Sequence, residues 1–311
     1  MGLTSSTADS SLFLCTDTSL PPFYVLVYVD DLVFASAETE ALTLLKSELQ
    51  KRHTCTDLGE LRSYLGLQIT QDRAWRTITL TQSHMVHQVI QHFGFQFSSP
   101  QPTPLSTSHS LSAPPLDKSV EPSGPYPELV GCLITSGIWL VRGGWGPVVL
   151  TGHADASWVD DAATEWSSQG YTFSLGSGSV FWRSTLSSSV LSSSCEAEIY
   201  AGAMAAQELH WLTYLLTELG EQPRSPLVLY VDNKAMIALC QEHRLEHRTK
   251  QIPLRYFLAQ ELQQRGQLRL AYVATRSNTS YIFTKALPPG DHQRFSIVLG
   301  LVLTLPHLLT A

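Results

Sequence analysis

The sequence predicts an α/β protein built around a mixed β-sheet with flanking helices. Its 311 residues leave room for about two domains at the usual ~100–200 residues each, and a hydrophobic content of 43% is enough to fill their cores. In the C-terminal half, three β-rich segments precede alternating helical and β-rich segments, an order typical of a mixed sheet covered by helices. A Pro- and Ser-rich segment separates two folded blocks.

The second block, about residues 148–287, carries most of this prediction. β-rich runs predict three strands, at Val148–Trp158, Gly170–Leu175 and Ser179–Ser184. Apolar residues at helical spacing from Ile199 to Leu219 predict a long helix that Gly220 ends. The remaining patterns predict, in order, a strand at Leu227–Val231, a helix from Asn233, a basic loop, a helix at Pro253–Arg265, a strand at Leu268–Val273 and a helix at Ser277–Leu287.

The first block, about residues 20–97, opens with two short strands around a tight acidic turn. Phe23–Val29 and Leu32–Ala35 are β-rich and flank Asp30 and Asp31. Leucines at helical spacing predict a helix at Glu38–His53. Further along, the patterns predict a hairpin formed by Tyr64–Thr70 and Thr77–Thr81 and a short helix ending at Gly94.

Composition limits the partners and the compartment. The net charge of −7 provides no overall positive field, so any nucleic-acid binding has to be local. The five cysteines are scattered, odd in number and without a C-x-x-C pair, which favours a reducing intracellular compartment, cytoplasm or nucleus, over a disulfide framework. Phe295–Ala311 carries no Asp, Glu, Lys or Arg, but Pro306 and His307 favour a packed or frayed tail over a membrane span.

Three acidic residues of the second block are placed at or directly after predicted strands or on the long helix. Asp155 lies on the first strand, Glu198 in the first turns of the long helix, and Asp232 directly after a buried strand. If these elements meet in one sheet, the like charges raise one another's pKa unless cations neutralise them. Oxygen-only ligands favour Mg²⁺ or Mn²⁺ over Zn²⁺, and two such ions can support phosphodiester hydrolysis. Spacing alone leaves open that these are solvated acids at strand ends.

Glu196 is the alternative to Glu198 as the metal ligand on the long helix. Ser193 and Glu196 have the S-x-x-E spacing of a capping box, which gives Glu196 a structural role at the helix start. Glu198 has no such role, and small Ala201 lies one turn further on, where the helix could press against the sheet. We therefore prefer Glu198 as the metal ligand.

Short motifs in matching order give the second block a family resemblance. It resembles the ribonuclease H domain of copia-type long-terminal-repeat retrotransposons through His153–Trp158, Ser193–Tyr200, Tyr230–Asn233, Arg248–Lys250, Tyr272–Thr275 and Ile282–Lys285. The resemblance covers roughly residues 150–287. It implies an RNase H-like sheet, two-metal cleavage of RNA in RNA/DNA hybrids, and metal roles for Asp155, Glu198 and Asp232.

One position departs from this family. The family carries a fourth carboxylate just before Ile-Phe-Thr-Lys, where this chain has Tyr281. A phenol, with an ordinary pKa near ~10, is a poor replacement for a carboxylate ligand. The departure predicts a weakened second metal site and impaired hydrolysis.

The first block resembles the reverse transcriptase of the same elements. Tyr28-Val29-Asp30-Asp31 between two β-rich runs matches the catalytic hairpin of that polymerase, and Leu58–Leu61 and Tyr64–Ile69 match the next segments of that family. The resemblance implies catalytic roles for Asp30 and Asp31, and it places the fingers and the first palm segment upstream of Met1. We therefore expect a truncated palm and thumb remnant at 1–97 without DNA synthesis, a linker and shortened connection at 98–147, an RNase H-like domain at 148–287 and an apolar tail at 288–311.

A basic segment follows Asp232 in the chain. Basic residues outnumber acidic ones between Gln241 and Arg276, and a solvated helix face is the ordinary explanation. Beside an acidic site we favour a surface that tracks the phosphates of a hybrid duplex, formed by Arg244, Arg248, Lys250 and Arg255. His243–His247 fits the H-x-x-E-H zinc pattern, but without a downstream acidic motif we set a zinc site aside.

Three hypotheses for the function remain open. The first is a copia-type Pol fragment with an impaired ribonuclease H that uses Mg²⁺ or Mn²⁺, binds RNA/DNA hybrid or other nucleic acid, and needs no small-molecule cofactor and no membrane. The second is a non-catalytic nucleic-acid-binding remnant. The third is a decayed reading frame whose product does not fold stably.

Overall fold

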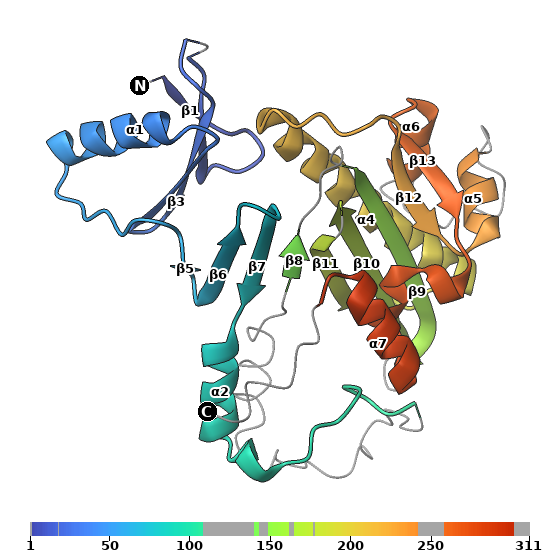
Figure 1. The fold of residues 1–311 in the computed structure, drawn as a ribbon. Helices are drawn as coiled ribbons and strands as arrows, with labels where there is room; N and C mark the ends of the chain where they lie inside the picture. Colours follow the sequence, from blue (N-terminus) through green and yellow to red (C-terminus); the bar gives the residue numbers. More distant parts are fainter. Residues whose placement is uncertain are drawn as a thin grey trace. The chain divides into compact units, whose positions relative to one another are not determined.

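The structure divides into two compact units (Figure 1). The first consists of Met1–Arg62 with Glu208–Pro223, and the second of Ser63–Gln207 with Arg224–Ala311. The computed structural model describes residues 2–17, 19–107, 140–142, 149–161, 165–176, 178–241 and 258–301.

The first unit contains a four-stranded antiparallel sheet with one helix packed on it. Its strands follow one another in chain order: β1 (Leu3–Ser5), β2 (Leu12–Cys15), β3 (Phe23–Tyr28) and β4 (Asp31–Ser36). Helix α1 (Thr39–Arg52) buries Ala41 and Leu45 against Phe23 and Val25. The predicted hairpin and helix are thus confirmed. β1 and β2 were not predicted, because strands of three and four residues are too short to show a clear alternation.

A small antiparallel sheet belongs to the second unit. It comprises β5 (Ser63–Tyr64), β6 (Leu67–Asp72), β7 (Thr77–Thr81) and β8 (Leu140–Arg142). Helix α2 (Ser83–His92) and the 3₁₀ helix η1 (Phe95–Phe97) follow β7 in the chain. The hairpin and the short helix agree with the sequence prediction. β8 does not, because it lies within the predicted linker. Its backbone pairs with the open edge of β7, and such pairing requires no side-chain pattern.

The main sheet of the second unit has five strands. They are β9 (Leu150–Asp161), β10 (Trp166–Leu175), β11 (Gly178–Leu186), β12 (Leu227–Val231) and β13 (Leu268–Tyr272). The order is β11-β10-β9-β12-β13: the first three strands are antiparallel, and β12 runs parallel to both β9 and β13. This arrangement confirms the mixed sheet that the sequence predicts.

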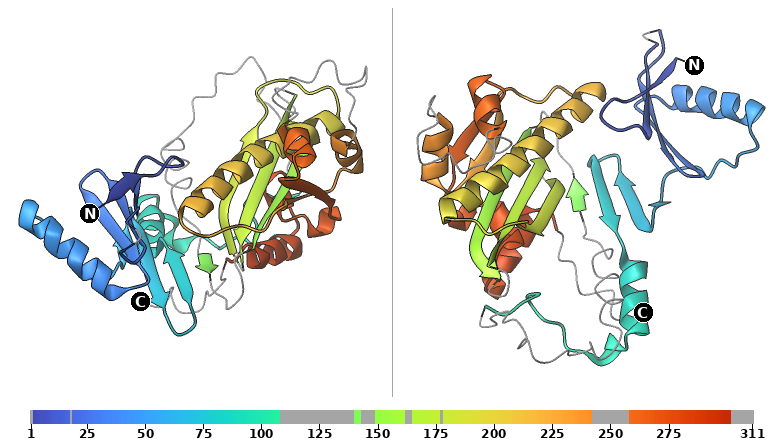
Figure 2. Two further views of the ribbon diagram at one scale, coloured as in Figure 1. Left: turned by 90° about the horizontal axis from the view of Figure 1, so that it is seen from above. Right: turned by 180° about the vertical axis from the view of Figure 1, so that it is seen from behind.

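Helices cover both faces of this sheet. The part of helix α4 (Ser194–Glu218) that belongs to this unit, up to Gln207, crosses one face, and α7 (Pro289–Val298) lies on the other (Figures 1 and 2). The shorter α5 (Lys234–Gln241) and α6 (Leu258–Gln264) follow β12 and precede β13. Gly220, at φ +78°, adopts the left-handed backbone that ends α4, as predicted.

The chain after β13 differs from the prediction in two respects. The helix predicted at Ser277–Leu287 is wrong: two 3₁₀ helices, η4 (Thr275–Ser277) and η5 (Thr279–Phe283), occupy most of this segment. The buried Asn278 between them explains the break, because its side chain accepts a hydrogen bond from the N–H of Ser280 and so competes with α-helical pairing.

The predicted apolar tail is also partly helical. Helix α7 occupies residues 289–298, with Pro289 in its first turn, where a proline costs no helical hydrogen bond. Residues 302–311 lie outside the described part of the chain. Among the helices of the described ranges, none combines the length and the apolar character needed to cross a bilayer.

Candidate metal centre

Strand register brings Asp155 and Asp232 together. β12 pairs in parallel with β9, with Tyr230 opposite His153, so that two residues further on Asp232 comes level with Asp155. Asp155 lies within β9, at the centre of the sheet, and is fully buried. Asp232 comes directly after the last residue of β12 and is partly exposed.

Helix α4 supplies the third carboxylate. Its first turns pack on β9 through small side chains: Ala197 and Ala201 are buried in one cluster with Ala156. Because these side chains are small, the helix comes close enough to the sheet for a carboxylate on its first turns to reach the neighbour of Ala156. Glu198 is only 8% exposed there and accepts a hydrogen bond from the N–H of Ala156.

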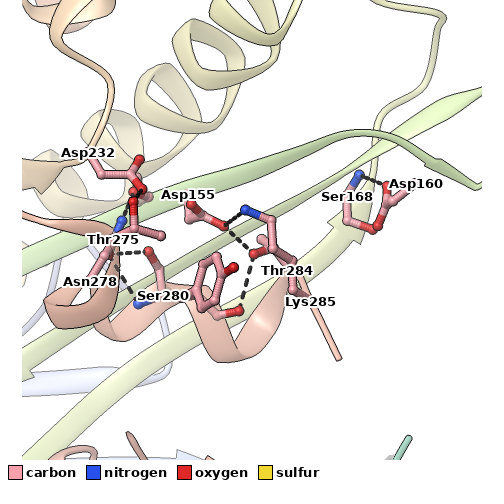
Figure 3. Close-up of polar contacts among 11 residues, drawn as sticks. Asp155, Asp160, Ser168, Asp232, Thr275, Asn278, Ser280, Thr284 and Lys285 are labelled. Atoms are coloured by element: carbon pink, nitrogen blue, oxygen red, sulfur yellow. Dashed lines mark hydrogen bonds and ion pairs between the residues drawn. The ribbon is translucent and has the colours of Figure 1, made fainter. Parts of the chain in front are cut away.

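The three predicted carboxylates therefore converge. One oxygen from each of Asp155, Glu198 and Asp232 lies within 4.8 Å of the other two. Asp232 also accepts a hydrogen bond of 2.5 Å from the hydroxyl of Thr275, which fixes its side chain (Figure 3). Residues far apart in the sequence thus form one acidic cluster.

Burial and mutual repulsion disfavour the ionised forms of this cluster. Burial, together with the charges of Asp155 and Asp232, raises the pKa of Glu198 to about 9. Burial also raises the pKa of Asp155 to about 6, although the Lys285 ammonium and the Thr284 hydroxyl oppose the rise. Without a cation, Glu198 therefore keeps its proton at neutral pH.

The donor set fits a hard divalent cation. Within the described part of the chain, Asp155 Oδ1 and Glu198 Oε2 are buried and accept no hydrogen bond. Buried carboxylate oxygens of this kind are costly unless a cation neutralises them. Oxygen-only ligands suit Mg²⁺ or Mn²⁺, so Asp155, Glu198 and Asp232 are the residues that would hold such an ion.

The other oxygen of Asp155 is engaged by the protein. The hydroxyl of Thr284 donates a hydrogen bond to Oδ2, and the ammonium of Lys285 lies 3.8 Å from the same atom (Figure 3). Both residues belong to the Ile282–Lys285 motif, but the motif by itself predicts no role for either of them. No sequence pattern pointed to this contact, because it depends on how η5 folds back on β9.

A glycine and an asparagine hold η5 against the sheet. Gly170 is the register partner of Asp155 on β10, and a Cβ at this position would lie 2.8 Å from the Cβ of Phe283 and 2.9 Å from the Cγ2 of Thr284. The side-chain amide of Asn278 donates to the carbonyl of Ala154 at 2.8 Å. Both features place Thr284 and Lys285 beside Asp155.

Glu196 lies outside the cluster and caps α4. Its carboxylate accepts from the N–H of Ser192 at 2.7 Å and from the hydroxyl of Ser192 at 2.5 Å, while its own N–H donates to the hydroxyl of Ser193 at 3.1 Å. This is the structural role that the S-x-x-E spacing predicts.

Tyr281, at the position of the family's fourth carboxylate, contacts apolar and cationic neighbours. Its ring lies 6.3 Å from that of Phe295 in α7, and the ammonium of Lys285 stands over it at 4.3 Å from the ring centre. The acidic cluster comprises Asp155, Glu198 and Asp232 and does not include this position.

The remaining predicted site residues lie elsewhere. Asp30 and Asp31 stand exposed at the tip of the β3–β4 hairpin, where Val29 has a φ of +53°. Across the described ranges, the Asp155 cluster is the only set of three or more His, Cys, Asp or Glu side chains within metal-binding reach, and it contains neither aspartate. The predicted phosphate-binding residues lie outside the described ranges: Arg244, Arg248, Lys250 and Arg255.

Fold and site together define a mixed α/β domain with a largely buried cluster of three carboxylates. Comparisons with known proteins show which proteins the chain is similar to. A family model described as reverse transcriptase (RNA-dependent DNA polymerase) matches residues 1–107. The retrovirus-related Pol polyprotein from transposon TNT 1-94 of Nicotiana tabacum is 27% identical over 323 residues, covering 89% of this chain and 24% of that protein.

Other relatives agree with this family. The Pol polyprotein from transposon RE2 of Arabidopsis thaliana is 27% identical over 344 residues, covering 97% of this chain and 23% of that protein. The resemblance seen in the motifs is therefore confirmed: the chain is a relative of the Pol polyproteins of copia-type retrotransposons. It spans about a quarter of the length of these relatives.

One similar solved structure is the N-terminal RNase H domain of a Mycobacterium tuberculosis protein, fused to maltose binding protein. The alignment covers 48% of this chain and 96% of the chain in that structure. Its TM-score is 0.33 and its sequence identity 12%. The assignment of the fold class accordingly depends on the strand order of the main sheet.

Proposed function

We propose that the second unit is a ribonuclease H of a retrotransposon Pol protein, which hydrolyses the RNA strand of RNA/DNA hybrids. The convergence of three carboxylates from β9, α4 and the end of β12 carries this proposal. The family relationship supports it, because the relatives are Pol polyproteins. A buried site built only from carboxylate oxygens suits phosphodiester chemistry with Mg²⁺ or Mn²⁺.

The residues of the chain have separable roles in this proposal. When bound, divalent ions activate water and stabilise the leaving oxygen in phosphodiester hydrolysis. Asp155, Glu198 and Asp232 hold the cation site in place. Thr275 orients Asp232 by its hydrogen bond, and Thr284 orients Asp155 in the same way. These contacts fix the carboxylates before any substrate arrives.

We further propose that hydrolysis is impaired in this chain. Tyr281 provides no carboxylate, and Lys285 contacts Asp155 on the side opposite the unpaired oxygen. The same observations favour the second candidate, a protein that binds nucleic acid without cleaving it. For such a protein, affinity would fall steeply with salt, since phosphate contacts release counterions.

DNA synthesis is a weaker proposal. Asp30 and Asp31 are exposed at a hairpin tip, and no further acid of the described ranges joins them in a metal-binding cluster. Polymerase chemistry by these residues would need additional ligands from outside those ranges.

Cleavage of a labelled RNA/DNA hybrid in Mg²⁺ or Mn²⁺ tests the proposal. Asp155→Asn should abolish cleavage, whereas Asp160→Asn, which changes an exposed acid on the same strand, should leave it unchanged. Increased cleavage by Tyr281→Asp would identify the missing ligand as the cause of impairment. Hybrid binding without any cleavage, in both wild type and Tyr281→Asp, would support the binding protein instead.

A further inference from the structure

Lys285 brings a fixed positive charge to the buried carboxylate at the centre of the sheet. Its Nζ lies 3.8 Å from Oδ2 of Asp155; the Lys285 side chain is 32% exposed, whereas that of Asp155 is 1% exposed. An ion pair of this kind is screened less than one on the surface, because one partner is withdrawn from water.

The two oxygens of Asp155 face different environments. Oδ2 receives the Thr284 hydroxyl and the Lys285 ammonium, whereas Oδ1 finds no hydrogen-bond partner among the residues that the structure describes. A carboxylate can give one oxygen to each of two cations. Here only Oδ1 remains for a metal ion, and Oε2 of Glu198 is likewise buried without a hydrogen-bond partner among the described residues.

The aromatic ring of Tyr281 helps to hold the ammonium in this place. Lys285 Nζ stands 4.3 Å from the centre of the Tyr281 ring, within the range of a cation–π interaction. Phe295 lies on the same tyrosine, with ring centres 6.3 Å apart. Tyrosine at position 281 thus provides no anionic metal ligand, and its ring instead binds the Lys285 ammonium through a cation–π interaction.

We propose that Lys285 is a tethered cation that fills one of two cation positions at Asp155, so that the acidic cluster takes a single divalent ion. This inference rests on the metal site of the proposed function and deepens it. Lys285 is a positioning residue here: it acts on the site through Asp155. Its removal should strengthen metal binding, because one positive charge no longer competes for Oδ2.

Mn²⁺ titration followed by electron paramagnetic resonance of the free ion tests this, with the full chain and without substrate. Lys285→Met should bind Mn²⁺ at least about tenfold more tightly than wild type. Lys285→Arg, which keeps the charge, should stay within about threefold of wild type. Circular dichroism melts confirm that each variant is folded.

Lys234 provides a matched control. Its ammonium also stands over a tyrosine ring, that of Tyr272, at 4.7 Å from the ring centre. Lys234→Met removes the same charge and the same type of ring contact, so it should change Mn²⁺ affinity by less than about threefold if the effect belongs to the Asp155 contact.

The outcomes separate this inference from the proposed function. Tighter binding by Lys285→Met but not by Lys234→Met supports the tethered cation, including the case in which wild type binds too weakly to measure. Equal affinities for wild type and Lys285→Met, or equal gains for both methionine variants, overturn it while the metal site stands. If neither wild type nor Lys285→Met binds Mn²⁺, the metal site itself fails, and the inference with it. The same holds if the binding persists after Asp155→Asn is introduced into the same protein.

Discussion

Replacing Glu198 with glutamine should stabilise the metal-free protein, and the size of the effect follows from its buried position. The pKa of Glu198 is about 9 in the folded chain, against an ordinary value of 4.5. Between these values the folded state binds more protons than the unfolded state, so the free energy of unfolding falls as pH rises. From pH 4.5 to pH 7 this fall is about 3 kcal/mol, at roughly 1.4 kcal/mol per pKa unit.

Glutamine has nearly the same shape and cannot ionise. Glu198→Gln should therefore match wild type near pH 4.5 and exceed it at pH 7 by up to about 3 kcal/mol. The contribution of Asp155, whose pKa is raised to about 6, is present in both proteins and largely cancels.

Urea denaturation in EDTA, followed by tryptophan fluorescence between pH 4.5 and pH 8.5, measures the difference. Asp160→Asn, on an exposed acid of the same sheet, is the control and should show no comparable growth of the difference with pH. Saturating Mg²⁺ should reduce the advantage of Glu198→Gln, since binding stabilises only the protein with three carboxylates. Parallel pH profiles for wild type and Glu198→Gln would refute the reasoning.

Three further substitutions test the supports of the site. Gly170→Ala introduces a Cβ within 3 Å of Phe283 and Thr284, so it should displace η5, lower the melting temperature and lower hybrid cleavage; an unchanged melting temperature would show that η5 yields freely. Asn278→Ala removes the amide contact to Ala154 and should cost about 1–3 kcal/mol of unfolding free energy in urea denaturation, with a loss near zero counting against its role. Glu196→Ala should cost about 0.5–2 kcal/mol through the lost cap but leave Mn²⁺ affinity unchanged; weakened Mn²⁺ binding would contradict its exclusion from the cluster.

The parts of the site that were predictable depend on local sequence. Asp232 follows a buried strand and Asp155 lies on one, so a shared sheet brings them level. The choice of Glu198 over Glu196 followed from the capping pattern, which is itself a local signal. In each case, the backbone element that carries the residue could be predicted from a few neighbouring positions.

The contacts around Asp155 could not be predicted in this way. Thr284 and Lys285 reach it because η5 folds onto β9 and β10, and that depends on a buried asparagine and on the absence of a side chain at position 170. The helical pattern of Ser277–Leu287 indicated an α-helix, but the side chain of Asn278 accepts a local hydrogen bond from the N–H of Ser280 and donates a long-range one to the carbonyl of Ala154, and together these outweigh the helical preference. Such long-range contacts leave no periodic signal in the sequence.

The central claim is that three carboxylates from distant parts of the chain share a divalent cation. A crystal structure of the full chain grown with Mn²⁺, with data collected at the manganese absorption edge, tests it most directly. We expect one strong anomalous peak among the side chains of Asp155, Glu198 and Asp232. Ordered carboxylates at this place without such a peak would contradict the claim.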